Sequence, residues 1–209
     1  MQAFERVVLA TTNAKKVAEM QRVFEGLPAR IADIDLTSAP PVDENGTTFA
    51  ENAAIKASEQ AKHFGLPAIG EDSGLVVPAL DGEPGVYSAR YSGNTSSKRE
   101  EVDAANNSKL LERMEGLKGA QRDAYYVSSI ALAMPDGQIV VAVEDQCHGR
   151  MLDQRRGAGG FGYDPLFEIR ELHRTFGELS PAVKAAISHR GRALRQFRRE
   201  LRRLLGTKP

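Results

Sequence analysis

Apolar and polar residues follow two different periods along the first part of the chain. Residues 4–11 form an apolar run that is typical of a strand, and residues 15–24 carry apolar side chains at helical spacing. Residues 29–36 alternate like a second strand, and the prolines that follow indicate an irregular loop over 38–46. The pattern therefore predicts a strand, a turn, a helix and a second strand.

The next helix has a clear start signal. Thr48, followed three residues later by Glu51, matches a capping box, which predicts a helix that runs to about residue 64 and is closed by Gly65. A further strand is expected to end in the sequence Ile-Gly-Glu-Asp-Ser-Gly at residues 69–74. The first half of the chain is thus expected to alternate strands and helices.

The second half of the chain combines glycine-rich segments with a predicted hairpin. Two apolar runs, 124–134 and 138–143, flank a Pro-Asp-Gly turn, which indicates an antiparallel pair. The other predicted segments are an irregular stretch at 84–94, a polar helix at 96–114, a glycine cluster at 157–162, and helices from 180 and over 188–205. We expect one domain over residues 1–209, a two-lobed α/β protein whose long mixed sheet is flanked by helices and has a central substrate cleft.

Charge and cysteine content narrow the functional classes. The 209 residues include 28 basic and 28 acidic side chains, so the net charge gives no general attraction to nucleic acid or to an anionic membrane. The single cysteine, Cys147, excludes an internal disulfide, and the apolar run at 7–10 is too short for a signal sequence or a spanning helix. We expect a soluble cytoplasmic protein that has neither nucleic acid nor a membrane as its partner.

The turn between the first strand and the first helix could bind an anion. Residues 11–16 read Thr-Thr-Asn-Ala-Lys-Lys, and the backbone N–H groups of a helix start carry partial positive charge. Lys16 adds a full charge. The plainer interpretation is an ordinary turn with Asn13 as N-cap and two solvated lysines, because the glycines of a P-loop are missing.

Two adjacent carboxylates, Glu71 and Asp72, indicate a cation site. They repel one another unless a cation intervenes, and Mg2+ prefers carboxylate oxygens and is commonly shared with substrate phosphates. The alternative is that Glu71 points to solvent and Asp72 caps a turn. Lys56 lies on the helix that follows Thr48, where it either lines the same cleft as Lys16 or belongs to a surface face with an intrahelical pair.

Two further segments could recognise a nucleobase. Residues 161–165 read Phe-Gly-Tyr-Asp-Pro and combine a ring that can stack on a base with an acid that can bond to a base or sugar. Taken alone, they are a loop with one core aromatic. His189 and Arg190 begin the last helix and either donate to a carbonyl or phosphate oxygen or cap the helix with solvated side chains.

The last helix is rich in arginine, with seven arginines between residues 190 and 203. An apolar stripe with a period of 3.6 predicts that this helix docks on the core, so we interpret the arginines as its solvated face. RNA binding through this face is the alternative, although no aromatic residues are interleaved with the arginines.

Seven motifs occur in order between residue 7 and about residue 195. They are Thr11-x-Asn13-x-x-Lys16, Gly46-x-Thr48-Phe49-x-Glu51-Asn52-Ala53, Lys56-Ala57, Glu71-Asp72-Ser73-Gly74-Leu75, Pro84-Gly85-x-Tyr87-Ser88-Ala89-Arg90-Tyr91, Gly159-Gly160-Phe161-Gly162-Tyr163-Asp164-Pro165 and Lys184-x-Ala186-Ile187-Ser188-His189-Arg190-Gly191. Together they resemble the inosine triphosphate pyrophosphatase family, in its bacterial dITP/XTP pyrophosphatase branch.

The resemblance implies a Mg2+-dependent hydrolase, usually a homodimer, that acts on a purine nucleoside triphosphate. Its substrates would be deaminated nucleotides such as ITP, dITP and XTP, which it converts to the monophosphate and pyrophosphate and so removes from the nucleotide pool. Asp72 is implied as metal ligand and proton acceptor, Lys16 as a catalytic residue and Glu44 as second metal ligand. The implied substrate-binding residues are Thr11, Thr12, Asn13, Ala14, Lys15, Lys16, Lys56, Ser73, Phe161, Gly162, Tyr163, Asp164, Lys184, His189 and Arg190.

The chain departs from the family pattern at two positions, since many relatives have Gly where Thr12 stands and many bacterial members have Asp where Glu71 stands. The acidic loop leaves Asp43, Glu44 and Glu71 open as the second metal ligand, and Glu44 is our choice. Donors at the start of the last helix would favour a carbonyl at purine position 6 over the amino group of adenine. A pool-cleaning enzyme that prefers another nucleotide, such as a modified pyrimidine, is the alternative.

Overall fold

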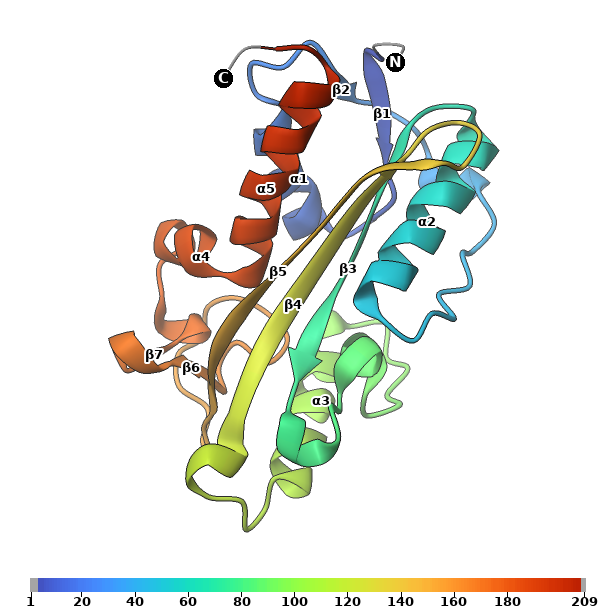
Figure 1. Cartoon of the computed structure of the whole chain (residues 1–209). Helices are drawn as coiled ribbons and strands as arrows, with labels where there is room; N and C mark the ends of the chain where they lie inside the picture. Colours follow the sequence, from blue (N-terminus) through green and yellow to red (C-terminus); the bar gives the residue numbers. More distant parts are fainter. Residues whose placement is uncertain (1–3, 208–209) are drawn as a thin grey trace. The chain divides into compact units, whose positions relative to one another are not determined.

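The computed structural model of the chain describes residues 4–207, with the side chains of residues 14 and 15 outside the description. Five helices and seven strands follow one another in the described part (Figure 1). In chain order they are β1 (Arg6–Leu9), α1 (Ala14–Phe24), β2 (Arg30–Ile31), α2 (Phe49–Phe64), β3 (Ala68–Val76), α3 (Arg99–Arg113), β4 (Asp123–Ala133), β5 (Ile139–Met151), β6 (Phe167–Ile169), β7 (Arg174–Thr175), α4 (Pro181–Ile187) and α5 (His189–Leu204).

The strands form one mixed sheet in the order β2-β1-β3-β4-β5-β6-β7. β1 pairs in parallel with β2 and with β3, whereas β5, β6 and β7 pair antiparallel. Parallel pairing at one end reflects the helices that connect β1, β2 and β3, and antiparallel pairing at the other follows from short connections. The prediction of an α/β fold with a mixed sheet is confirmed.

The chain divides into two compact units, which we describe separately. The first contains the chain up to Asp72, the segment Ser128–Asp145 and the chain from Arg192 on. The second contains Ser73–Val127 and Gln146–Gly191. The predicted single domain and the predicted central cleft stay predictions.

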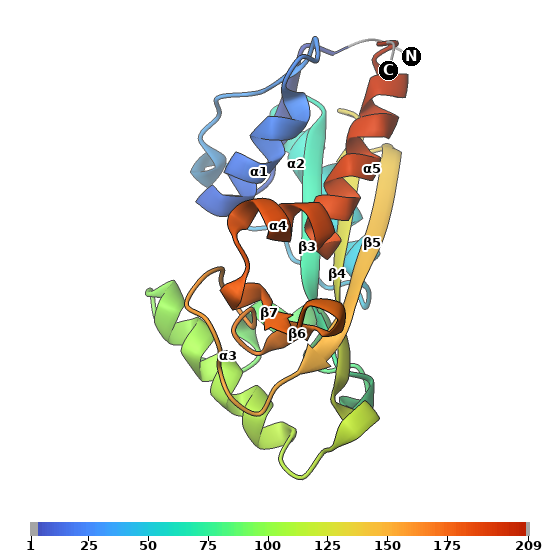
Figure 2. The same cartoon turned by 90° about the vertical axis from the view of Figure 1, so that its left-hand side faces the viewer.

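Strand alternation gives the first unit two separate cores, one on each face of its part of the sheet. Val7 of β1 faces one core and its neighbour Val8 faces the other, as do Ile69 and Ala68 of β3. Successive strand side chains point to opposite faces, so this division follows directly from the backbone. α1 and α5 cover the face of the larger residues, and α2 covers the alanine-rich face (Figures 1 and 2).

The alanine-rich face lets α2 lie close to the sheet. Ala53, Ala57 and Ala61 of α2 are almost completely buried there. Gly70 of β3 completes the close approach, because a Cβ at this position would lie 2.2 Å from the carbonyl oxygen of Ala53. This packing fixes how α2 presents its polar residues next to β3.

The second unit has its own core, built on aromatic side chains from distant parts of the chain. Tyr126 of β4 contacts Phe167 of β6 with ring centroids 4.8 Å apart, and Phe176 lies 5.0 Å from Phe167. Leu110 of α3 is fully buried in the same cluster. Edge-to-face and tilted aromatic contacts of this kind hold β4, β6 and the following turn together.

Most predicted elements are present, and the capping box is confirmed in detail. Thr48 accepts from the backbone of Glu51, the Glu51 side chain accepts from the backbone of Thr48, and Gly65 ends α2 in a left-handed conformation with φ 63°. The expected hairpin is β4 and β5, but β5 runs eight residues further than the predicted end at Val143. Beyond Val143 the sequence of β5 no longer predicts a strand, because polar residues are mixed with the buried ones.

Two predictions about strands are wrong. The strand expected over 29–36 is reduced to Arg30–Ile31, because Asp35 caps a 3-10 turn at Leu36–Ser38. The strand expected to end at Glu71 and Asp72 continues to Val76, so both carboxylates lie within β3 rather than at its end. β6 and β7 were not foreseen, since two or three residues give no measurable period.

None of the helices in the described part of the chain is both long enough and apolar enough to cross a bilayer.

Candidate active site

Glu71 and Asp72 point to opposite faces of the first unit's sheet, because they are consecutive residues of β3. Glu71 falls on the same face as Ile69, which packs with α1 and α5. Asp72 falls on the same face as Ala68, which packs with α2. The two carboxylates therefore have different partners among the contacts described below, and the expectation of a shared cation stays a prediction.

Glu71 is held on the α1 face by a lysine and a serine. Its Oε2 lies 3.7 Å from Nζ of Lys16 on α1, and its Oε1 accepts a hydrogen bond of 3.2 Å from Oγ of Ser128 on β4. Only 5% of Glu71 is exposed. A buried carboxylate needs such partners, so the alternatives of a solvated Glu71 and a solvated Lys16 are both wrong.

Asp72 belongs to a group on the α2 face that we call the α2 cluster: Glu44, Asn52, Lys56 and Asp72. Nδ2 of Asn52 donates to Oδ2 of Asp72 at 3.1 Å. Nζ of Lys56 lies 2.8 Å from Oε2 of Glu44 and donates to the backbone carbonyl of Glu71 at 3.0 Å. Asn52 and Lys56 are four residues apart and so share one face of α2. Lys56 is not in an intrahelical pair, and the surface interpretation of this helix face is wrong.

The predicted anion-binding turn precedes α1. Oδ1 of Asn13 accepts from the backbone N–H of Lys16 at 3.4 Å, which is an N-cap arrangement, and Thr11 Oγ1 accepts from Asn13 N at 3.2 Å. Thr11 and Thr12 line a cavity of about 530 Å³ together with Glu44 and Lys56. Two residues of this turn and two of the α2 cluster therefore line the same space in the first unit. The predicted contacts of the Ala14 and Lys15 side chains lie outside the described residues.

The donor set of the α2 cluster fits a Mg2+ ion that is shared with a substrate. In the described part of the chain, no three His, Cys, Asp or Glu side chains are grouped so that they could hold a metal by themselves. Glu44 and Asp72 both contact the same face of α2, whereas Glu71 is directed to the opposite face of the sheet. Mg2+ is commonly bound by one or two carboxylates and completed by water and phosphate oxygens, which matches this pair. The observation favours Glu44 over Glu71 as the second ligand.

The second unit holds the other predicted residues, and Asp164 organises them. Oδ2 of Asp164 accepts from the backbone N–H of Phe161 at 2.8 Å and pairs with Nζ of Lys184 on α4. That Nζ also lies 4.9 Å from the centre of the Phe161 ring. Asp164 is buried, so its carboxylate fixes the loop backbone rather than standing open to a sugar or base.

Helix α3 forms hydrogen bonds with the backbone of the same loop at Gly162. The backbone N–H of Gly162 donates to Oδ2 of Asp103 at 2.7 Å, and its carbonyl accepts from Nδ2 of Asn107 at 2.9 Å. Tyr163 turns into the core, where its hydroxyl donates to the carbonyl of Ser88 at 2.9 Å. The Tyr163 side chain is thus a core aromatic, and the loop is held through backbone groups on both sides of it.

His189 and Arg190 are buried at the start of α5, so the alternative of solvated side chains is wrong. The imidazole of His189 stacks on the Tyr126 ring, with centroids 4.6 Å apart and 8° between the planes. The guanidinium of Arg190 donates to Oγ of Ser73 at 3.0 Å and lies 5.4 Å from the centre of the Phe161 ring. Burial raises the pKa of Tyr126 well above its ordinary value, so its hydroxyl stays neutral under the histidine.

Comparison with known proteins identifies the family. The model of the Ham1 family matches residues 7–200. The chain belongs to the Ham1 family. It is 48% identical over 190 residues to a dITP/XTP pyrophosphatase of Geobacter sulfurreducens, a match that covers 90% of this chain and 92% of the relative.

Solved structures of Ham1 proteins share the fold. A HAM1 protein from Coxiella burnetii is 40% identical and superposes with a TM-score of 0.84 over 96% of this chain and 100% of that chain. A nucleoside-triphosphatase and dITP/XTP pyrophosphatase from Mycobacterium abscessus is 42% identical with a TM-score of 0.75, over 92% and 97% of the two chains. The family resemblance deduced from the ordered motifs is confirmed.

The sequence analysis did not identify several residues of the site, because they are polar residues that lie within apolar or helical patterns. Ser128 interrupts the apolar run of β4, and it supplies a hydrogen bond to Glu71. Asp103 and Asn107 are polar residues four apart on α3, and both are buried. A search for buried-looking polar residues in predicted elements would have selected all three.

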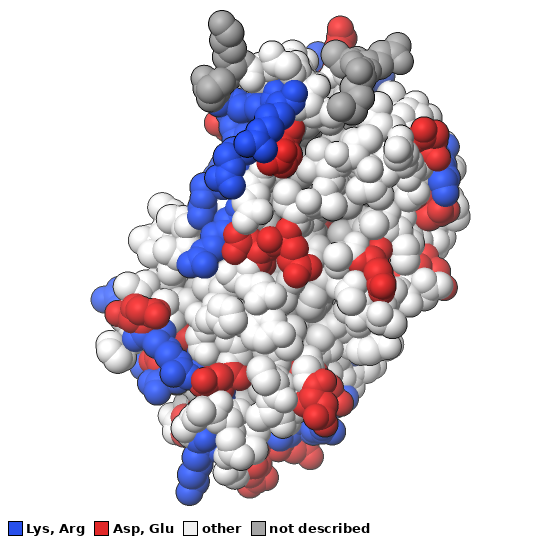
Figure 3. Space-filling view, in the orientation of Figure 1, with Lys and Arg blue, Asp and Glu red and all other residues white. Residues whose placement is uncertain are grey.

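The arginine-rich face of α5 is partly structural. Phe197 and Leu201 are fully buried, which confirms the predicted docking stripe of this Ham1 helix. Arg198 donates to the backbone carbonyls of Arg22, Val23 and Glu25 at and beyond the end of α1, where cations are favoured. Basic side chains gather along α5 with acidic ones beside them (Figure 3). RNA binding by this face stays the alternative interpretation.

Proposed function

We propose that the chain hydrolyses deaminated purine nucleoside triphosphates, such as ITP, dITP and XTP, to the nucleoside monophosphate and pyrophosphate. The observation that carries the proposal is family membership with 48% identity to a relative named dITP/XTP pyrophosphatase over nearly the whole chain. The α2 cluster supports it, because its Glu44 and Lys56 line one cavity with Thr11 and Thr12, the residues of the turn that precedes α1. These groups suit a triphosphate and its metal ion.

Within this proposal, Glu44 and Asp72 would hold Mg2+, which when bound would supply positive charge near the phosphate oxygens. Lys16 adds positive charge on the α1 face of β3, and Lys56 adds positive charge on the α2 face. Nζ of Lys16 lies 3.7 Å from the carboxylate of Glu71, and Nζ of Lys56 lies 2.8 Å from that of Glu44. The N–H groups at the start of α1 and the hydroxyls of Thr11 and Thr12 complete the phosphate-binding surface.

The chemical step is attack of water on the α-phosphorus. Asp72 accepts the proton of that water, and Asn52 holds the carboxylate through the 3.1 Å hydrogen bond to Oδ2. The bond between the α-phosphorus and the bridging oxygen breaks, and its electron pair leaves with pyrophosphate. Lys16 and Lys56 stabilise the charge that develops on this leaving group.

Residues of the second unit select the nucleotide base. His189 and Arg190 are the donors for a carbonyl at purine position 6, and their burial makes an unpaired donor costly. Adenine offers an amino group at this position, so ATP would leave these donors unpaired or crowd them. The stack on Tyr126 restricts the imidazole ring to one plane, which keeps the donor direction fixed.

A substrate panel tests the proposal. ITP, XTP, dITP, dTTP, GTP and ATP are each incubated with the protein, with and without Mg2+, and pyrophosphate and orthophosphate are measured separately. We expect pyrophosphate from ITP, dITP and XTP only when Mg2+ is present. Equal turnover of ATP, or release of orthophosphate in place of pyrophosphate, would contradict the proposal, and preference for dTTP would favour a pyrimidine enzyme.

The proposal includes a homodimer, as the family resemblance implies, and a cytoplasmic location, as the sequence analysis expects. Light scattering coupled to size-exclusion chromatography measures the first, and a monomer mass at micromolar concentration would contradict it. Cell fractionation measures the second, since the substrates of a pool-cleaning enzyme are the free nucleotides of the cytoplasm.

A further inference from the structure

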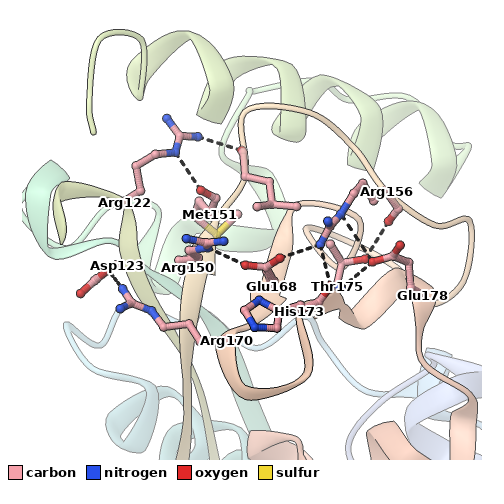
Figure 4. Close-up of polar contacts among 11 residues, drawn as sticks. Arg122, Asp123, Arg150, Met151, Arg156, Glu168, Arg170, His173, Thr175 and Glu178 are labelled. Atoms are coloured by element: carbon pink, nitrogen blue, oxygen red, sulfur yellow. Dashed lines mark hydrogen bonds and ion pairs between the residues drawn. The ribbon is translucent and has the colours of Figure 1, made fainter. Parts of the chain in front are cut away.

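A buried carboxylate of the second unit pairs with Arg156, the residue that precedes the loop carrying Phe161. Glu168 on β6 has only 2% of its side chain exposed. Nε of Arg150 contacts its Oε2, and a terminal nitrogen of Arg156 contacts its Oε1 at 2.7 Å (Figure 4). Each carboxylate oxygen therefore has its own guanidinium, and charge-assisted bonds of this kind are strong and directional.

Arg156 is the residue immediately before the loop. We call residues 157–164 the glycine loop. The backbone N–H of Arg156 donates to the carbonyl of Pro165 at 2.8 Å, so these two residues close the base of the loop. Its side chain also donates to the carbonyl of His173 at 3.2 Å and lies 3.5 Å from Glu178. One side chain thus ties the loop base to β6 and to the segment that follows it.

The segment after β6 leaves the glycine loop little freedom. Oγ1 of Thr175 donates to the carbonyl of Arg156 at 2.7 Å. The N–H of Gly159 donates to the carbonyl of Gly177 at 2.9 Å, and the N–H of Gly177 donates to the carbonyl of Asp164 at 3.0 Å. A Cβ at Gly157 would lie 2.3 Å from the carbonyl of Gly177. The loop is packed against this segment too closely to shift without breaking these bonds.

We propose that Glu168, acting through Arg156, is a positioning residue that holds the glycine loop in the conformation that binds the nucleotide base. The inference rests on the proposed function and on the expectation that the Phe161 ring of this loop stacks on the nucleotide base. Arg156 is 41% exposed at its side chain, so the buried carboxylate is what gives it a fixed direction. Arg150 shares the same carboxylate but, among the described residues, has no hydrogen bond or ion pair to the glycine loop, and it therefore provides a matched control.

The variants Glu168→Gln and Arg150→Gln test the inference. Hydrogen exchange of the amides of residues 157–164 is measured first, because it needs no activity. Glu168→Gln should speed exchange in this segment and leave α1 and α2 unchanged. For ITP, KM should rise about tenfold with kcat within about twofold, since the lost interaction serves binding rather than the chemical step. Inhibition by tripolyphosphate, which has no base, should be unchanged.

Arg150→Gln should leave loop exchange and the KM for ITP near the wild-type values. If it raises both as much as Glu168→Gln, or if Glu168→Gln weakens tripolyphosphate and ITP equally, the carboxylate acts as general support and the inference is wrong. Unchanged exchange and KM in Glu168→Gln would also overturn it. Should Glu168→Gln fail to fold, Arg156→Lys and Arg156→Gln replace it, and Lys is expected to restore part of the KM that Gln loses.

These outcomes are separable from the fate of the proposed function. If the wild-type protein does not hydrolyse ITP, the proposed function fails, whereas the exchange measurement still decides whether Glu168 anchors the loop. If the wild-type protein hydrolyses ITP and Glu168→Gln behaves like wild type, only the positioning role fails.

Discussion

The α2 cluster and the glycine loop place functional groups in different ways. The α2 cluster consists of side chains on or beside regular elements, and its members contact one another, as Asn52 contacts Asp72 and Lys56 contacts Glu44. The glycine loop has irregular backbone and is held from outside by α3, α4 and the segment after β6. A helix and a strand already fix their side chains, whereas an irregular loop needs external bonds to take a single conformation.

The difference separates catalytic residues from supporting ones. In the α2 cluster, the groups that react are also the groups that pair, and they are only partly buried, with 15% of the Lys56 side chain and 29% of the Glu44 side chain exposed. Around the glycine loop, the carboxylate of each pair is more deeply buried, with 4% of the Asp164 side chain and 2% of the Glu168 side chain exposed, and these carboxylates hold the loop in place. Substitutions in the first region should therefore alter activity with little loss of stability, and substitutions in the second should cost stability.

The largest expected effect is loss of catalysis in the α2 cluster. Asp72→Asn keeps the size of the side chain but removes the proton acceptor, so kcat for ITP should fall by about 10²- to 10⁴-fold. Pyrophosphate release measures the change, and the far-ultraviolet circular dichroism should match wild type. Asp43→Asn, on the neighbouring loop, is the matched control and should keep kcat within a few-fold. Full activity of Asp72→Asn would remove Asp72 from the mechanism.

Removing the lysine of an ion pair should lower the free energy of unfolding more beside the glycine loop than in the α2 cluster. Lys184→Gln leaves Asp164 with 4% of its side chain exposed and no ammonium partner, which should lower the free energy of unfolding by about 3 kcal/mol. Lys56→Gln leaves Glu44 able to hydrate, so its cost should stay below about 1 kcal/mol. Urea denaturation at pH 7 measures both. Equal losses would show that burial does not distinguish the two pairs.

A substitution at the start of α2, in the first region, should have a smaller effect on stability. Thr48→Ala removes the N-cap acceptor for the backbone of Glu51 and should lower the free energy of unfolding by about 1 kcal/mol. Because α2 carries Asn52 and Lys56, tripolyphosphate binding should weaken with it. Thr47→Ala loses only a side-chain bond to Glu51 and should change stability by less than about 0.5 kcal/mol. A loss as large in Thr47→Ala would argue against the cap.

The smallest expected effect is a pH dependence in the second region. Burial raises the pKa of Glu168, but hydrogen bonds from Arg150 and Arg156 outweigh it, so the pKa lies below the ordinary value of 4.5. A pKa that is lower in the folded state stabilises the fold above the unfolded pKa, and this stabilisation is lost as the pH falls through the folded pKa. The stability difference between wild type and Glu168→Gln should therefore be full at pH 7 and shrink below about pH 4.5. A difference that grows on acidification would contradict the lowered pKa.

Local signals predicted the elements and the order of the motifs well. The capping box at Thr48, the turn between β4 and β5 and the apolar stripe of α5 are all encoded within a few residues of one another. The strand over 29–36 failed because Asp35 forms a competing turn with Thr37, a side-chain bond that apolar alternation does not reveal. The short strands β6 and β7 failed because pairing partners, rather than their own residues, define them.

The candidate residues were predicted more fully than their partners. The motifs pointed to Glu71, Asp72, Lys16 and Lys56, but the carboxylates were expected to share a cation. Strand alternation in β3 instead sends Glu71 to Lys16 and Ser128, and Asp72 to Asn52. Their placement was wrong because the two residues were taken to follow the strand, where alternation no longer applies, whereas both lie within β3.

By itself, the sequence determined which residue types are present, which segments form helices and long strands, and which family the motifs resemble, because these depend on neighbours in the chain. Tertiary structure alone decided which partner each charged group takes, since those partners are far away in sequence. Ser128 reaches Glu71, and Arg150 and Arg156 reach Glu168, only after the strands pair. A buried charge is stabilised by whatever the fold brings within a few ångströms of it, and that distance is not encoded locally.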